Sequence, residues 1–213
     1  MERNITITLE KAREWYNSDN NSLKEVALQA FSEDELIYNF KNITTFKNAC
    51  EVLGLDYYAM SSIAENIAMF SKASAAMSKL NIIRKALNLG QDLHLTKDSK
   101  NPYTYYPNNS FVTESSTYYY DKLNSGKIEV IGKIKSEEIL YNVIGGDTYS
   151  SDTANLGRFF SDDGVGFAAA NIGFLGCASE EIAQHFSKYF GMLITEAKYG
   201  DMVDFEIIEN KYQ

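Results

Sequence analysis

Residues 127–146 read KIEVIGKIKSEEILYNVIGG, and this stretch decides the fold class. Apolar and polar residues alternate at 127–135 and again at 138–146, a period that is typical of β-strands. The second half is ambiguous, because Ser136 followed by two glutamates also resembles the start of a helix. Ile, Tyr, Val and Ile before a glycine pair favour a strand. We therefore predict two successive strands.

The sequence after this stretch predicts more strands and one helix. LGRFFS (156–161) and NIGFLGC (171–177) have the composition of strands, as does MVDFEII (202–208) near the end. Ser179, followed by two glutamates that suit a helix N-terminus, opens an amphipathic helix that Gly200 ends.

The first ninety residues have the pattern of helices with clear capping signals. Thr8 is placed to cap one helix, and Thr45 opens another that Gly54 closes. Three further pairs have the spacing of a capping box, in which two side chains satisfy free backbone amides reciprocally: Ser22 with Glu25, Ser32 with Glu35, and Ser62 with Glu65.

The last helix of this half is predicted to be the longest, over 62–89, with Gly90 after it. Its apolar residues recur every three or four positions and predict one buried stripe. The stripe comprises Ile63, Ile67, Phe70, Met77, Leu80, Ile83 and Leu87.

The order of these elements predicts an α+β protein, in which helices come first and strands follow. We expect a helical module at 1–90 and a tyrosine-rich connecting segment at 91–126, which holds both prolines and many turn-forming residues. The third part, 127–213, is expected to be a small, mainly antiparallel sheet with a C-terminal helix packed on it.

Composition and charge exclude several partners. The formal net charge is −9, and residues 91–213, with 10 basic and 18 acidic side chains, carry most of it. Such a surface repels phosphate backbones, so we expect no nucleic-acid partner. Without an apolar run of about 20 residues or a secretory signal, we expect no membrane association and a place in the cytoplasm or in a virion.

A glycine-rich run, SDDGVGFAAANIGFLGC (161–177), fits the G-x-G-x-x-G/A spacing of dinucleotide-binding loops at Gly164, Gly166 and Ala169. That chemistry needs a helix starting inside the motif and an acidic residue on a following strand. Asn171 and later glycines break any such helix. We interpret the run as turns and tight packing, and we expect no cofactor.

Cys177 and His185 are the best available catalytic residues, as a nucleophile with its base. The competing interpretation places Cys177 at the end of a buried strand and His185 beside an apolar stripe. The nearby aspartates are a candidate carboxylate or calcium site, but they lack the spacing of an EF-hand, so we predict no metal. These acids are Asp147, Asp152, Asp162 and Asp163.

Tyrosines are the most suggestive binding feature of the sequence. Six of them cluster within eighteen residues beside both prolines, and tyrosine supplies rigid contact area with a polar tip at many interfaces. The alternative is ordinary core packing. The candidate binding residues are Tyr103, Tyr105, Tyr106, Tyr118, Tyr119 and Tyr120.

Several stretches resemble one known group of sequences. ITLEKAREWYNSDNNSLKEVALQAFSEDEL, ITTFKNACEVLGL, NIIRKALNLGQDL, YTYYP and IGFLGCASEEIAQHFSKYF are similar to segments of an uncharacterised family from gut Bacteroides-group bacteria and their tailed phages. Common members carry basic residues before the closing helix, where this chain has Phe174 to Ala178. The resemblance implies a phage or mobile-element origin and no particular activity.

These observations lead to two hypotheses. The first is a non-enzymatic, phage- or prophage-encoded interaction protein that binds a protein partner, either a virion component or a host factor. The second is a small-molecule enzyme with a pocket between the modules, using Cys177, His185 and nearby aspartates. The oligomeric state is left open.

Overall fold

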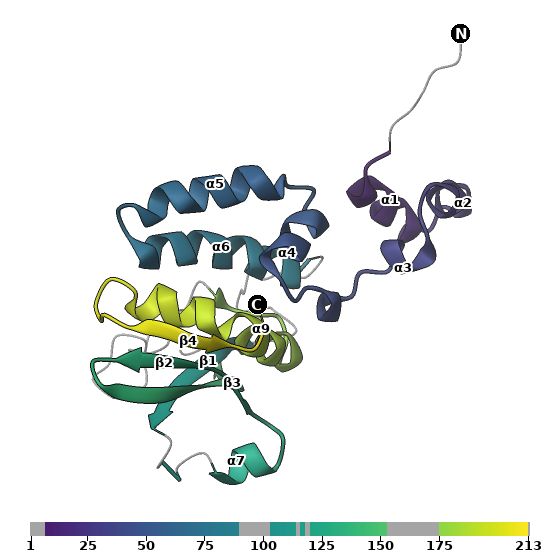
Figure 1. The fold of residues 1–213 in the computed structure, drawn as a ribbon. Coiled ribbons are helices and arrows are strands. Elements are labelled where there is room, and N and C mark those ends of the chain that lie inside the picture. Colours follow the sequence, from purple (N-terminus) through teal and green to yellow (C-terminus); the bar gives the residue numbers. More distant parts are fainter. Residues whose placement is uncertain (1–6, 90–102, 114–115, 118–119, 153–174, 213) are drawn as a thin grey trace.

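A computed structural model describes residues 7–89, 103–113, 116–117, 120–152 and 175–212 (Figure 1). The predicted strand at 156–161 and most of the one at 171–177 lie outside these residues. So do the glycines of the dinucleotide-like motif.

The sheet contains β1 (Tyr103–Thr113), β2 (Glu129–Ser136), β3 (Ile139–Asp152) and β4 (Glu206–Asn210). Its strand order is β1-β3-β2-β4, and every pairing is antiparallel. Helix α9 (Glu180–Tyr199), which Ser179 caps as predicted, packs on the sheet (Figure 1). The predicted α+β fold, helices first and then an antiparallel sheet with a C-terminal helix on it, is confirmed.

Strand β1 lies inside 91–126, which we expected to be a tyrosine-rich connecting segment. Over 103–113 this segment instead forms a strand, because every residue except Asn109 pairs with β3. Pro107 is compatible with this position, since β1 is the first strand in the sheet order and an edge strand tolerates a missing N–H donor. Helix α7 (Tyr120–Asn124) then precedes β2.

The turn between β2 and β3 is a tight two-residue turn, because Ser136 pairs directly with Ile139. Its first residue, Glu137, has φ of 53°, a left-handed conformation that costs a non-glycine residue about 1–2 kcal/mol. Glycine adopts this conformation freely but loses more backbone entropy on folding.

We therefore expect Glu137→Gly to stabilise the protein by about 0.5–1 kcal/mol. Chemical denaturation of the two proteins measures this difference. An unchanged or lower midpoint would show that Glu137 makes compensating contacts in the turn.

Helices α1 (Leu9–Tyr16), α2 (Asn21–Ala30) and α3 (Glu33–Leu36) form a small unit set apart from the main body (Figure 1). Among the side chains described in this unit, those of Ala12, Ala27 and Leu36 are fully buried. The predicted cap at Thr8 and the capping box of Ser32 with Glu35 are confirmed. The box of Ser22 with Glu25 is wrong, because the Asn20 side chain caps α2 two residues earlier.

The remaining helical region contains η1 (Phe40–Asn42), α4 (Phe46–Val52), α5 (Tyr57–Ala68) and α6 (Lys72–Leu87). Thr45 caps α4 as predicted. Gly54, with φ of 65°, ends it as predicted, and the next amide, that of Leu55, donates to the Cys50 carbonyl at 2.9 Å.

The single helix predicted over 62–89 is wrong. Asp56 caps α5, so Ser62 and Glu65 lie inside that helix and not at its start. The chain then breaks after Ala68, and Ser71 caps α6. Phe70, assigned to the buried stripe, is instead 91% exposed in this break.

The main core is shared between the helical region and the C-terminal helix. Helix α6 packs directly on α9, and their buried residues belong to one cluster. From the helical region the cluster takes Ile43, Ala49, Leu80, Ile83, Ala86 and Leu87, and from α9 it takes Ile182, Ala183, Phe186, Phe190 and Ile194.

The sheet and α9 are in close contact beside a bulge in β3. The pairing of β1 with β3 shifts between Asn108 and Ser110, where Asn109 alone lies opposite Gly145 and Gly146, so β3 carries the extra residue. The buried Asn109 amide donates to the Ile144 carbonyl of β3 at 3.0 Å and to the Ser187 carbonyl of α9 at 3.1 Å. Gly191 of α9 faces this amide, and a Cβ at Gly191 would lie less than 3 Å from it.

Ion pairs join β2 to α9 and to the C-terminal residues after β4. The Glu129 carboxylate binds Lys188 of α9 at 2.6 Å and also binds Lys211, which follows β4. Partial burial by itself raises the pKa of Glu129. Hydrogen bonds from Lys188, Lys211 and Tyr212 outweigh this effect and lower the pKa to about 2.

A carboxyl group whose pKa is lower in the folded state than in the unfolded state, near 4.3, stabilises the fold above that pH. This contribution is lost as the pH falls from about 5 toward 2. Because the side chain is partly exposed, we expect Glu129→Gln to cost only about 1 kcal/mol at pH 7 and almost nothing near pH 2. Denaturation at both pH values tests this, and an equal cost at both would contradict it.

Candidate functional site

Three turns that are far apart in the sequence meet at one end of the molecule. Asp201, in the α9–β4 turn, accepts hydrogen bonds from the Ser71 hydroxyl and from the Ala73 amide at the start of α6. The Ser136 hydroxyl, at the end of β2, donates to the Asp204 carbonyl at 2.9 Å. The α5–α6, α9–β4 and β2–β3 turns are thereby tied to one another (Figure 1).

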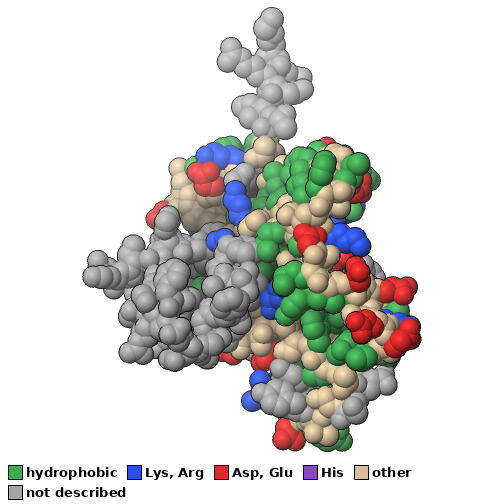
Figure 2. Space-filling model, turned by 90° about the vertical axis from the view of Figure 1, so that its left-hand side faces the viewer, with side chains coloured by type: hydrophobic (Ala, Val, Ile, Leu, Met, Phe, Trp, Pro, Cys, Tyr) green, Lys and Arg blue, Asp and Glu red, His purple; other side chains and the backbone are tan. Residues whose placement is uncertain are grey.

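These turns present large apolar side chains to solvent. Met69 is 79%, Phe70 91% and Met202 80% exposed, and Ile139 and Val203 are also exposed. We call these five residues the end surface. Figure 2 looks onto this end and shows hydrophobic side chains in a band across several elements, with carboxylates along one side. Exposed apolar side chains that gather on one face are candidates for an interaction site.

An apolar pocket of about 260 Å³ opens beside the end surface, between the sheet and the last turn of α9. The Ser136 side chain is its polar member. Its apolar lining consists of Phe111, Ile134, Tyr141, Tyr199, Val203 and Phe205.

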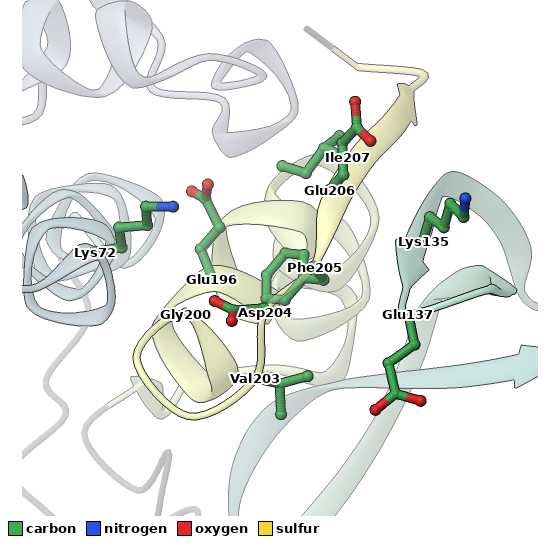
Figure 3. A pocket seen from close by; sticks show the side chains of 10 residues that line it. All are labelled: Lys72, Lys135, Glu137, Glu196, Gly200, Val203, Asp204, Phe205, Glu206 and Ile207. Carbon is green, nitrogen blue, oxygen red and sulfur yellow. The ribbon is translucent and has the colours of Figure 1, made fainter.

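A larger cleft of about 530 Å³ shares Val203 and Phe205 with this pocket (Figure 3). Four carboxylates line it and only two ammonium groups, one of which, Lys135, is already paired with Glu138 at 3.2 Å. The charged lining residues are Glu137, Glu196, Asp204, Glu206, Lys72 and Lys135.

Glu196 is the half-buried acid of this cleft, and Lys72 extends toward it from α6 (Figure 3). Burial raises the pKa of Glu196, against the opposing charges of Lys79 and Lys72. Among the residues that the structure describes, none forms an ion pair with Glu196 within 4 Å. Burial disfavours the charged form of Glu196, and a cation bound in the cleft would stabilise that form.

The structure describes three of the six candidate tyrosine side chains, and these three differ in exposure. Tyr106 is buried in the main core, as the alternative of ordinary core packing has it, and Tyr105 is half-buried against the same core. Tyr120 is 62% exposed on α7. Tyr103 belongs to β1, but its side chain is not among the described ones, and Tyr118 and Tyr119 lie outside the described residues.

Cys177 lies fully buried in the main core, and its backbone forms an isolated antiparallel β-bridge with that of Tyr105. Burial raises the pKa of its thiol to about 12, although a hydrogen bond with Asn88 and the charge of Arg84 act in the opposite direction. Because the thiolate is the nucleophile, this cysteine is unreactive at neutral pH. The structure therefore counts against Cys177 as a catalytic residue.

His185 lies at the junction of the helical region and the sheet, where it lines a pocket of about 320 Å³. Its Nε2 is 2.8 Å from the Ile43 carbonyl, which can only accept, so Nε2 carries the proton. Burial lowers the pKa of His185, although the Ile43 bond raises it. His185 is thus a neutral side chain that joins α9 to the helical region.

The candidate aspartates give no metal site within the described residues. Asp147 binds the Asn108 side chain at 3.1 Å and Lys122 at 3.2 Å. The Asp152 side chain is not described, and Asp162 and Asp163 lie outside the described residues. In that part of the chain, no three His, Cys, Asp or Glu side chains are grouped so as to hold a metal ion.

Comparisons with protein-family models, with curated proteins and with solved structures found no match for this chain. None of the described helices is both long and apolar enough to cross a membrane. The geometry of the end surface therefore carries the functional argument.

Proposed function

We propose that this chain is a non-enzymatic interaction protein, encoded by a phage or prophage, that binds a protein partner through its end surface. The observation that supports it is the exposure of Met69, Phe70 and Met202 on turns that hydrogen bonds hold together. Exposed methionines and aromatics on a fixed framework are suited to serve as anchors in a partner's pockets. The phage or prophage origin rests on the sequence resemblance alone.

The burial of Cys177 supports the same reading, because it removes the nucleophile on which the enzyme hypothesis depends. The tyrosines contribute less than expected. Tyr120 remains a candidate contact, whereas Tyr106 serves the core.

Replacing Phe70 or Met202 with aspartate is expected to weaken capture of the partner at least tenfold, because either change places a charge where an apolar contact forms. Each purified variant is used as bait in lysate of infected or lysogenic host cells, and retained proteins are quantified by mass spectrometry against wild type.

Leu28→Asp is the matched control, since Leu28 is 46% exposed on α2, in the separate helical unit. Surface changes of this kind leave folding stability within about 0.5 kcal/mol. The proposal is contradicted if all three variants lose capture equally. It is also contradicted if none of them loses capture.

A further inference from the structure

The apolar pocket and the acidic cleft together restrict the chemistry of the partner. At about 260 Å³ the pocket is smaller than the roughly 300–1,000 Å³ typical of sites for whole small molecules. Its size and apolar lining suit one large apolar side chain. The end surface lies at its mouth, since Val203 belongs to both and Ile139 is two residues before the pocket residue Tyr141.

The acidic cleft favours a partner that carries positive charge. It adjoins the pocket through Val203 and Phe205, so a peptide that fills one is next to the other. Its carboxylates outnumber its ammonium groups by two. Glu196, half-buried and without an ion-pair partner among the described residues, is the acid that gains most from a cation.

We propose that the end surface binds a basic, amphipathic segment of the partner protein. One large apolar side chain of that segment enters the pocket lined by Phe111, Tyr141 and Phe205. A neighbouring lysine or arginine reaches the Glu196 cleft. This inference rests on the proposed function and gives the partner its chemistry.

Charge distinguishes this occupant from two others. A second copy of the chain would bring another formal charge of −9 to an acidic face, which disfavours self-association there. An anionic membrane surface would be repelled for the same reason. A cationic segment is attracted.

Fluorescence anisotropy with labelled synthetic peptides tests the inference on the full chain. The first peptide carries a Lys-Phe-Leu-Arg centre between glycine and serine residues. In the second, glutamates replace the two basic residues, and in the third, serines replace the two apolar ones. We expect the first peptide to bind at least tenfold more tightly than either of the others, and salt to weaken it.

Two variants locate the binding site. Glu196→Gln keeps the shape of the side chain and removes its charge, so we expect binding of the first peptide to weaken at least fivefold. Glu25→Gln, an exposed change on α2, is the matched control and should leave it unchanged. Circular dichroism melting of both variants verifies that they are folded.

The outcomes separate this inference from the proposed function. If Phe70→Asp and Met202→Asp abolish capture while the three peptides bind alike, the surface is a docking site but its partner is not basic, and the inference is wrong. If Glu196→Gln binds the first peptide as wild type does, the cleft is not the cationic site, and the inference is also wrong. Stronger binding to anionic vesicles than to the first peptide would mean that the surface binds a membrane and not a basic segment. Dimerisation that Phe70→Asp abolishes would mean that it binds a second copy of the chain.

Discussion

Replacing Asn109 with aspartate is expected to destabilise the protein by about 3 kcal/mol or more at neutral pH. The buried Asn109 amide donates to two carbonyl groups, those of Ile144 and Ser187. A carboxylate there loses both hydrogen bonds and places negative charge against two carbonyl oxygens in a site with little water. Burying an ion without a partner is among the most costly single changes.

This loss should depend on pH in a defined direction. Because burial disfavours the charged form, the pKa of the new aspartate is raised in the folded state above its unfolded value near 3.9. The deficit is therefore smallest below pH 4 and grows as the pH rises through the folded pKa. Asn109→Ala is the control, since it removes the same bonds without adding charge, and it should cost about 1–2 kcal/mol with no comparable pH dependence. A pH-independent loss for Asn109→Asp would mean that solvent reaches the site.

Gly191→Ala is expected to cost about 2 kcal/mol, although alanine normally stabilises a helix by about 1 kcal/mol relative to glycine. A Cβ at this position would lie less than 3 Å from the Asn109 amide and from the Ile131 side chain, so α9 would have to move off the sheet. Overpacking of this kind typically costs 1–3 kcal/mol. Urea denaturation measures the difference, with the exposed Gln184→Ala on the same helix as control.

The two sites are coupled, because the Asn109 amide is what the added methyl group would meet. Combining Asn109→Ala with Gly191→Ala should therefore cost less than the sum of the single changes. Strict additivity would indicate that the methyl group added at residue 191 clashes mainly with the Ile131 side chain and not with Asn109.

The features that the sequence predicted correctly are those determined by near neighbours. Thr8, Thr45 and Ser179 cap helices because each side chain bonds an amide three residues ahead. The β2–β3 hairpin was predictable for a similar reason, since alternation and a short polar turn determine it locally.

The errors arise where distant parts of the chain decide the structure. The helical periodicity continues through 69–71, so the sequence pattern does not predict the break before Ser71. The Ser71 hydroxyl donates a hydrogen bond to Asp201, 130 residues away, and this contact stabilises the break. β1 was missed because its proline and asparagines resemble a loop, whereas pairing with β3 makes it a strand. The end surface depends on the hydrogen bonds of Asp201 with the start of α6, so Phe70 was assigned to a buried stripe, and Met202 and Val203 to a strand.

The shared core has a consequence for how the chain is made. Helix α6 completes its apolar contacts only with α9, which begins at residue 180. At about 5–20 residues per second, translation leaves Leu80 and Ile83 uncovered for roughly 5–20 s after they have been synthesised. During that interval the nascent helical region is a substrate for chaperones and a risk for aggregation. A messenger truncated before α9 should therefore yield an insoluble fragment and not a folded N-terminal half.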